Sequence, residues 1–543
     1  MSQGAKQHRG IAKTIELLCQ TGNEAAVPPL LAALNSPHRK IEEGALEAIL
    51  IRRSLVGQRE ILRRMDTICD RWHTIIESHR GRMTQAIRDA ILDRDEVTCR
   101  NGCSAAVRFR EYDLIPTLVN AIEDEANPHA DLAATTLLSL TDMLYEELHS
   151  PRDYRNRRDP QMVRRNVTVS LDDSTKRFVK HHRRETVEAF LLLAGRDNST
   201  LMHILADPRH SSYLALIHVL QHSMRQGILK LILSYLDDPH APSALINVMV
   251  HRPDERFLEL LLRKIGREPS AGAKANLRHV TSIIWLKDGP QSLDTFDDAM
   301  QHSALQLVLA SGMKPSDQFT VLQHLLLFGT TGGRRAAAEA LAKFPGSDAN
   351  LLITKCLQDP DGQVQASALS QLRPRCMPGA LSTLIDALDS PHALARKAAQ
   401  DALPEYAFPR FAAVFESLSE PVKNTTGSLT MRVDPHAAAL LRQEMRSNSG
   451  KRCMRAFAMA RAMDAVPLLE DTIREALSDS DHLVRVEAAA ALGESDSPAA
   501  LATLQNALHD SSLMVQEAAQ ASLEAIDSRR RVSPTDEIIE ALS

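Results

Sequence analysis

The sequence predicts an all-α chain folded as an α-solenoid of helical hairpins, with two irregular insertions in the array. The first observation is a fixed offset of 31 residues, which carries residues 357–360 (LQDP) onto 388–391 (LDSP) and 477–479 (LSD) onto 508–510 (LHD). The second is the spacing of three and four between apolar residues on both sides of these turns, which is typical of amphipathic helices. The third is length: 543 residues, 44% of them hydrophobic, exceed one ordinary core. Stacked hairpins fit all three, because each hairpin buries its apolar stripe against its neighbours.

Each regular unit is expected to contain two short helices joined by a polar turn. Residues 499–527 illustrate the pattern, with Leu501, Leu504 and Leu508 before the turn and Val515 and Leu523 after it. In several turns a short acceptor precedes proline, and we expect the acceptor to cap the second helix and the proline to occupy its first turn. These pairs are Ser36-Pro37, Asp238-Pro239, Asp359-Pro360 and Ser390-Pro391.

One turn in the C-terminal part allows a more specific prediction. Asp479 or Asp481 is expected to cap the helix that follows, because a carboxylate can accept from a free amide at a helix N-terminus. Arg485 is expected to reach an acidic or carbonyl group of an adjacent repeat.

Residues 479–493 (DSDHLVRVEAAAALG) resemble the second helix of a HEAT repeat. The short period is similar to that of the subgroup first described in phycobilin lyase subunits. The resemblance is strongest over 350–406 and 464–527 and extends to 25–54. The resemblance implies an armadillo-like α-solenoid of the kind that usually binds other macromolecules. It predicts the fold more specifically than the activity, because proteins with this fold have diverse functions.

Two stretches interrupt the periodicity and divide the chain. Residues 150–185 are polar and arginine-rich, with Pro151, Pro160 and an alternating run at 167–171 that suggests a short extended piece. Residues 408–434 contain Pro409 and Pro421 and alternate at 429–433, which suggests a second insertion with one short strand. The expected organisation is an N-terminal array (1–149), an arginine-rich insertion or linker (150–185), a central array (186–407), the second insertion (408–434), C-terminal repeats (435–528) and a polar tail (529–543).

Charge is segregated around the first insertion. Residues 111–150 contain nine acidic residues and no Lys or Arg, whereas 151–185 contain 11 basic and five acidic residues. The basic segment can fold back on the acidic repeat, which we favour slightly for the resting protein, or it can recruit an acidic partner. The residues expected to contact that partner are Arg164, Arg165, Lys180, Arg183 and Arg184.

Catalytic motifs are missing from the sequence. There is no Gly-x-Gly fingerprint, no Gly-x-Ser-x-Gly elbow and no His-Glu pair, and the last of these counts against the di-iron hydroxylases built from HEAT repeats. Cys99 and Cys103 lie one helical turn apart without further zinc ligands nearby, so small buried residues are the better interpretation. We therefore expect a protein that is not an enzyme and uses no metal or cofactor.

The remaining features predict compartment and partners. Seven scattered cysteines, no apolar signal segment and no long apolar run favour a cytoplasmic protein without a membrane span. The predicted function is a scaffold or adaptor that binds another protein along the concave face formed by second helices, and the basic insertion suggests an acidic partner. Two alternatives stay open: an accessory subunit of a bilin or tetrapyrrole lyase, and a nucleic-acid-binding protein. The second is less favoured because the net charge is −5.

Overall fold

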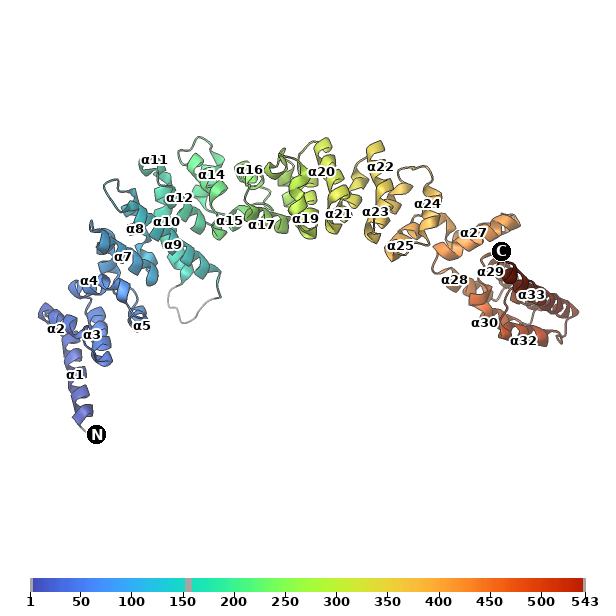
Figure 1. The fold of residues 1–543 in the computed structure, drawn as a ribbon, viewed down its shortest axis with the longest axis horizontal. Coiled ribbons are helices and arrows are strands. Elements are labelled where there is room, and N and C mark those ends of the chain that lie inside the picture. The colour runs from blue at the N-terminus through green and yellow to red at the C-terminus, as the bar shows by residue number, and fades with distance from the viewer. Residues whose placement is uncertain (1–2, 152–158, 541–543) are drawn as a thin grey trace. The chain divides into compact units, whose positions relative to one another are not determined.

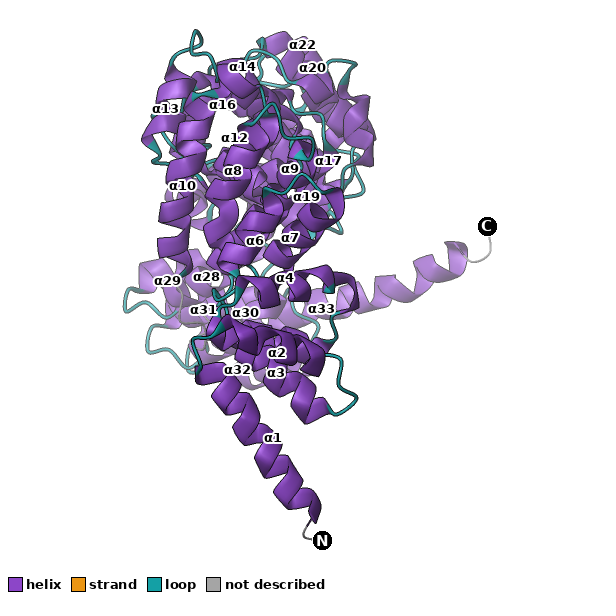
Figure 2. Cartoon of the chain, turned by 90° about the vertical axis from the view of Figure 1, so that its left-hand side faces the viewer, coloured by secondary structure: helices purple, strands orange, loops and turns teal. Residues whose placement is uncertain are grey.

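The computed structural model describes residues 3–151 and 159–540, and within them every regular element is a helix (Figure 2). The predicted all-α class is confirmed. The chain divides into two compact units, an N-terminal unit (Met1–Gln318) and a C-terminal unit (Phe319–Ser543). No helix in the described ranges is long and apolar enough to cross a membrane.

The N-terminal unit consists of short helices that follow one another along the chain (Figure 1). Their bounds are α1 Gln3–Gln20, α2 Val27–Ala33, α3 Arg39–Arg52, α4 Leu55–Arg63, α5 Asp70–Ser78, α6 Thr84–Ile91, α7 Glu96–Arg108, α8 Ile115–Glu123, α9 Ala130–His149, α10 Pro160–Lys176, α11 Phe178–His181, α12 Arg184–Leu193, α13 Ser199–Ala206, α14 Tyr213–His222, α15 Gln226–Ser234, α16 Ser243–His251, α17 Glu255–Ile265, α18 Ala271–Leu277 and α19 Asp298–Ala310.

Helix α20 (Pro315–Phe328) spans the boundary between the units, and hairpins continue through the C-terminal unit. The helices there are α21 Thr331–Ala340, α22 Ser347–Cys356, α23 Gly362–Leu372, α24 Ala380–Ala387, α25 Ala393–Asp401, α26 Phe408–Val414, α27 Glu420–Val433, α28 Ala437–Met445, α29 Gly450–Ala462, α30 Val466–Ala476, α31 His482–Leu492, α32 Pro498–Ala507 and α33 Leu513–Glu540. The second helices form one row in this unit, in which α21, α23, α25, α27, α29, α31 and α33 each pack against the next.

The acceptors before the prolines have a different role from the one expected. Ser36, Asp238, Asp359 and Ser390 each accept a hydrogen bond from the backbone amide two residues later. They therefore close the turn between the two helices, and the proline lies inside that turn rather than in the helix. The capping residue of α23 is instead Asp361, which accepts from the amides of Gln363 and Val364.

The prediction for 479–493 is confirmed. Asp481 caps α31 by accepting from the Leu483 amide at 2.9 Å, and Asp479 closes the preceding turn. Arg485 reaches the next repeat and binds both carboxylate oxygens of Asp510 at 2.9 Å. The same bidentate pair occurs between Arg334 and Asp359, again 25 residues apart, so this bond joins successive hairpins at two places in the unit.

The arginine-rich segment is helical from Pro160 onwards, and residues 152–158 lie outside the described part of the chain. No extended piece forms at 167–171, because these residues lie within α10. Val163, Val167 and Leu171 are buried at a spacing of four, while Val169 is exposed. Helix α10 packs against α8, α9 and α12, so it occupies a place in the array.

The strand expected at 429–433 is also a helix. The buried residues of α27 are Gly427, Thr430 and Val433, a spacing of three that defines a helical face, and three alternating residues were too short a run to indicate a strand. Pro409 and Pro421 lie within the first two positions of α26 and α27, where proline favours helix initiation. The phenylalanines of this segment join the core that is shared with α28–α33.

Candidate functional site

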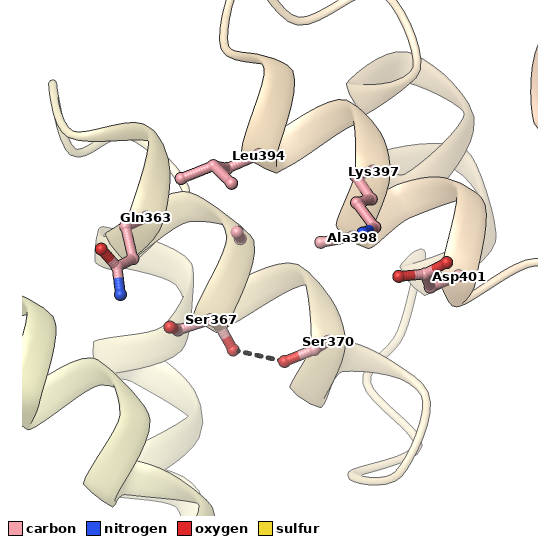
Figure 3. A pocket seen from close by; sticks show the side chains of 8 residues that line it. Gln363, Ser367, Ser370, Leu394, Lys397, Ala398 and Asp401 are labelled. Carbon is pink, nitrogen blue, oxygen red and sulfur yellow. Dashed lines mark hydrogen bonds between the residues drawn. The ribbon is translucent and has the colours of Figure 1, made fainter.

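An open hollow lies on the second helices α23 and α25 of the C-terminal unit. Its volume is about 430 Å³. Figure 3 shows Gln363, Ser367 and Ser370 on one helix opposite Leu394, Lys397 and Asp401 on the other. The local sequence explains the opening, because small residues at the facing positions, such as Ala366 and Ala398, leave the space between the helices unfilled.

A second hollow of about 500 Å³ continues from α25 to the end of α27. Lys397 and Asp401 line both hollows, so the two form one cleft across three successive second helices. Asp434 and Pro435, which follow α27, line it at that side. We call this surface the α23–α27 cleft.

Exposed apolar side chains recur at one position of the repeat. Leu394, Leu483 and Met514 are each the second residue of a second helix, and their exposed fractions are 54%, 40% and 50%. The equivalent residue of α23 is Gln363, at the edge of the cleft. Because this position is not used to pack the repeats together, its apolar groups are available for contact with another molecule.

The cleft offers contacts for binding and no catalytic arrangement. Its charged groups, Lys397, Asp401, Arg396 and Asp434, are of both signs, and its walls are short aliphatic and hydroxyl side chains. Near its rim, hydrogen bonds from Arg335 lower the pKa of the capping carboxyl of Asp361 to about 2. Within the described ranges no group of three His, Cys, Asp or Glu side chains is arranged to hold a metal ion.

The five basic residues singled out in the sequence fall into two groups, at opposite ends of the α10–α12 hairpin. Arg164 lies near the end of α12, where its Nε donates to the Leu193 carbonyl at 2.7 Å, and Arg165 is exposed beside it. The other three, Lys180, Arg183 and Arg184, lie at or before the start of α12. At a rise of 1.5 Å per residue, the ten residues of α12 separate the groups by roughly 15 Å.

Part of the basic segment folds back on the acidic repeat. Arg183 binds Asp131 at 2.8 Å, and Arg177 binds Glu123 at 3.0 Å. Arg184 points its guanidinium at the His218 ring, and Lys180 is exposed. The fold-back arrangement favoured for the resting protein therefore accounts for Arg183 but not for Arg165 or Lys180.

The sequence did not indicate the α23–α27 cleft. Serine and alanine at helix positions give no signal of an opening, because a small residue can equally mark close packing. The exposed leucine was the available signal: Leu394 follows the turn at the same place as Leu483, where a purely structural repeat would carry a polar residue.

Comparison with known proteins places part of this fold in a family. A family model described as HEAT repeats matches residues 330–404 and 436–532, which include the α23–α25 part of the cleft. These two segments are similar to HEAT repeats. The match overlaps the stretches 350–406 and 464–527 that resembled HEAT repeats, whereas 25–54 is not matched and the short-period subgroup stays a prediction. No curated protein matches the chain in sequence.

Several solved structures are similar to the chain at low identity. One comes from work on a phosphorylation switch in the interaction between cadherin and beta-catenin, with a TM-score of 0.33 and 13% identity over 92% of this chain and 99% of that chain. Kap121p has a TM-score of 0.26 and 11% identity over 95% and 57% of the two chains. Human deoxyhypusine hydroxylase in complex with glycerol has a TM-score of 0.16 and 18% identity over 55% and 96%. Such likenesses do not tell what this chain binds.

Proposed function

We propose that this chain is a non-enzymatic scaffold that binds a protein partner along the second helices of its C-terminal unit. The observation that carries the proposal is the α23–α27 cleft, an open surface that crosses three repeats without being filled by the chain itself. A surface shared by successive repeats suits an elongated ligand, such as an extended or helical segment of another protein.

The lining of the cleft indicates how such a segment would bind. Leu394 supplies an apolar contact, and the small side chains of Ala366 and Ala398 allow the partner's backbone to approach closely. Lys397 and Asp401 are one helical turn apart on α25 and would fix the direction of the segment through ion pairs of opposite sign.

The experiment compares two leucine variants. Partners are captured from the native cell with the purified full chain and identified by mass spectrometry, and the affinity of the purified partner is then measured. We expect Leu394→Asp to weaken binding at least tenfold. The matched control is Leu351→Asp, which changes a leucine that is 66% exposed on α22, a first helix of the same unit. Equal effects of the two substitutions, or none from Leu394→Asp, would contradict the assignment of the cleft.

The partner is proposed to be acidic where it meets the N-terminal unit. Exposed Arg165 and Lys180 support this, because they present positive charge beyond the pairs that Arg183 and Arg177 form with Asp131 and Glu123. Arg164 and Arg184 lie beside them and add to this charge. Replacement of Arg164, Arg165, Arg183 and Arg184 by Ser should reduce partner capture and make it less sensitive to salt. If the variant binds the partner with the same affinity and the same salt dependence as the unsubstituted chain, these residues take no part in recognition.

A further inference from the structure

A second, smaller pocket lies in the N-terminal unit, where α9, α10, α12 and α15 lie next to one another (Figure 1). Its volume is about 250 Å³. The pocket is built from the end of α9, the start of α10, the loop that follows α12 and the first half of α15. We call it the α10–α15 pocket. It is separate from the α23–α27 cleft, and it shares Arg164 with the basic residues proposed to contact an acidic partner.

The charge of this pocket is of one sign. Arg164, Arg196 and Lys230 come from three different elements, and no Asp or Glu is among the described residues that line the pocket. Lys230 is exposed and forms no ion pair within the described ranges, while Arg196 has only long contacts of 3.8 Å with Asp197 and Asp238. Three cations against two carboxylates at these long distances leave an excess of positive charge, so an anion would be attracted to the pocket.

The guanidinium of Arg164 is fixed in orientation. Its Nε donates to the Leu193 carbonyl at 2.7 Å, which leaves its terminal nitrogens for other acceptors. A Cβ atom on Gly195 would lie 2.8 Å from one of these nitrogens, so only glycine leaves the guanidinium in this place. Fixed forked donors are the arrangement that proteins use for two oxygens of one anion.

Neutral groups complete the wall. Burial raises the pKa of Tyr145, so its hydroxyl stays protonated and can donate at neutral pH. The His149 ring lies over the Tyr145 ring at 4.1 Å between centroids, and Nδ1 of His149 is 2.8 Å from the Tyr145 carbonyl. The amide of Gln161 adds a further donor at the start of α10. An adjoining hollow, lined by Arg165, Asp172 and Asp197, shares Arg164 and Gly195 with this pocket, so two carboxylates lie beyond the guanidinium of Arg164.

We propose that the α10–α15 pocket binds the dianion of a phosphate monoester. Three positive charges, one of them on the fixed guanidinium of Arg164, match a group with two negative charges and three terminal oxygens better than they match a carboxylate, which has one charge and two oxygens. The size of the pocket suits one such group with a short stem. Two sources share this chemistry: a free small phosphate ester, and a phosphorylated side chain of a partner protein.

The test measures binding of defined probes to the full chain by isothermal titration calorimetry. The probes are inorganic phosphate, phosphoserine, a short peptide that contains phosphoserine, the same peptide without phosphate, and acetate. We expect the phosphate probes to bind at least tenfold more tightly than acetate or the unphosphorylated peptide. Equal affinity for phosphoserine and the phosphopeptide supports a free ester as the ligand, and tighter binding of the phosphopeptide supports a modified partner.

Charge-removing variants locate the site. Arg164→Gln, Arg196→Gln and Lys230→Gln should each weaken phosphate binding about tenfold or more. Arg209→Gln is the matched control, since Arg209 is exposed in the same unit outside the pocket. Lys230 makes no side-chain bond within the described ranges, so Lys230→Gln should leave folding intact, and circular dichroism verifies this. Absence of saturable phosphate binding to the unsubstituted chain, or an equal loss in Lys230→Gln and Arg209→Gln, would overturn the proposal.

Discussion

Arg252 carries a buried charge that ties three helices together in the N-terminal unit. Its side chain is fully buried, and its Nε donates to Asp254 at 2.7 Å. Its terminal nitrogens donate to the carbonyls of Leu220 and Ser223, which lie at the end of α14 and have no partner within that helix. We predict that Arg252→Met will strongly destabilise this region.

The magnitude follows from what the substitution leaves behind. Methionine fills much of the same volume but donates no hydrogen bond, so two buried carbonyls and the Asp254 carboxylate lose their donor. Removing one partner of a buried ion pair costs about 3–5 kcal/mol, since the remaining charge stays desolvated. Asp254 keeps one hydrogen bond that partly offsets this cost, because it still caps α17 by accepting from the Phe257 amide. We therefore expect a loss of about 3 to 4 kcal/mol.

Hydrogen exchange is the appropriate assay, because stability in a solenoid is local. The midpoint of a global unfolding transition would average the stabilities of all repeats. Amides of α14, α16 and α17 should exchange faster in Arg252→Met, while those of the C-terminal unit should not change. The matched control is Arg256→Met on α17. Because Arg256 is exposed, this substitution should change the free energy of unfolding by no more than about 0.5 kcal/mol. Similar exchange in the two variants would refute the reasoning.

Three further predictions concern the C-terminal unit. Asp481→Ala should cost about 1 kcal/mol, because the Leu483 amide loses its acceptor, and hydrogen exchange should increase in α31 but not in α14–α17; a uniform increase along the chain would disprove local control. The pKa of Asp361 is lowered to about 2 in the folded chain, against about 3.9 when unfolded, so its ion pair with Arg335 stabilises the fold above pH ~4 and this stabilisation is lost as the pH falls through ~2. Unfolding of α21–α23 followed from pH 5 to pH 2 should therefore show a weaker pH dependence in Arg335→Gln than in the unsubstituted chain, and identical profiles would count against the pair. Gly427→Ala should destabilise the packing of α27 on α29 by about 1–3 kcal/mol, because the new Cβ would lie 2.3 Å from the Ala462 carbonyl oxygen; a gain in thermal stability, as helix propensity alone predicts, would show that the helices can move apart.

Local chemistry is what the sequence by itself determined about this protein. The hairpin period, the cap by Asp481 and the reach of Arg485 to the next repeat were all predictable, because a cap involves residues two or three apart and the ion pair follows the repeat. The same reasoning identified Cys99 and Cys103 as small buried residues, and both are buried in α7. The spacing of three and four between apolar residues predicted the helices, because this spacing also involves only residues that are close together in the chain.

Contacts between distant residues were decided only by the tertiary structure. The prolines at 409 and 421 looked like interruptions because a sequence does not show whether a proline ends one helix or begins another, and packing of the segment into the C-terminal core settled it. Arg252 binds carbonyls 29 and 32 residues earlier, so nothing beside it in the chain marks it as buried. Both the α23–α27 cleft and the α10–α15 pocket are spaces between helices of different repeats, and a space exists only once the helices that enclose it are packed.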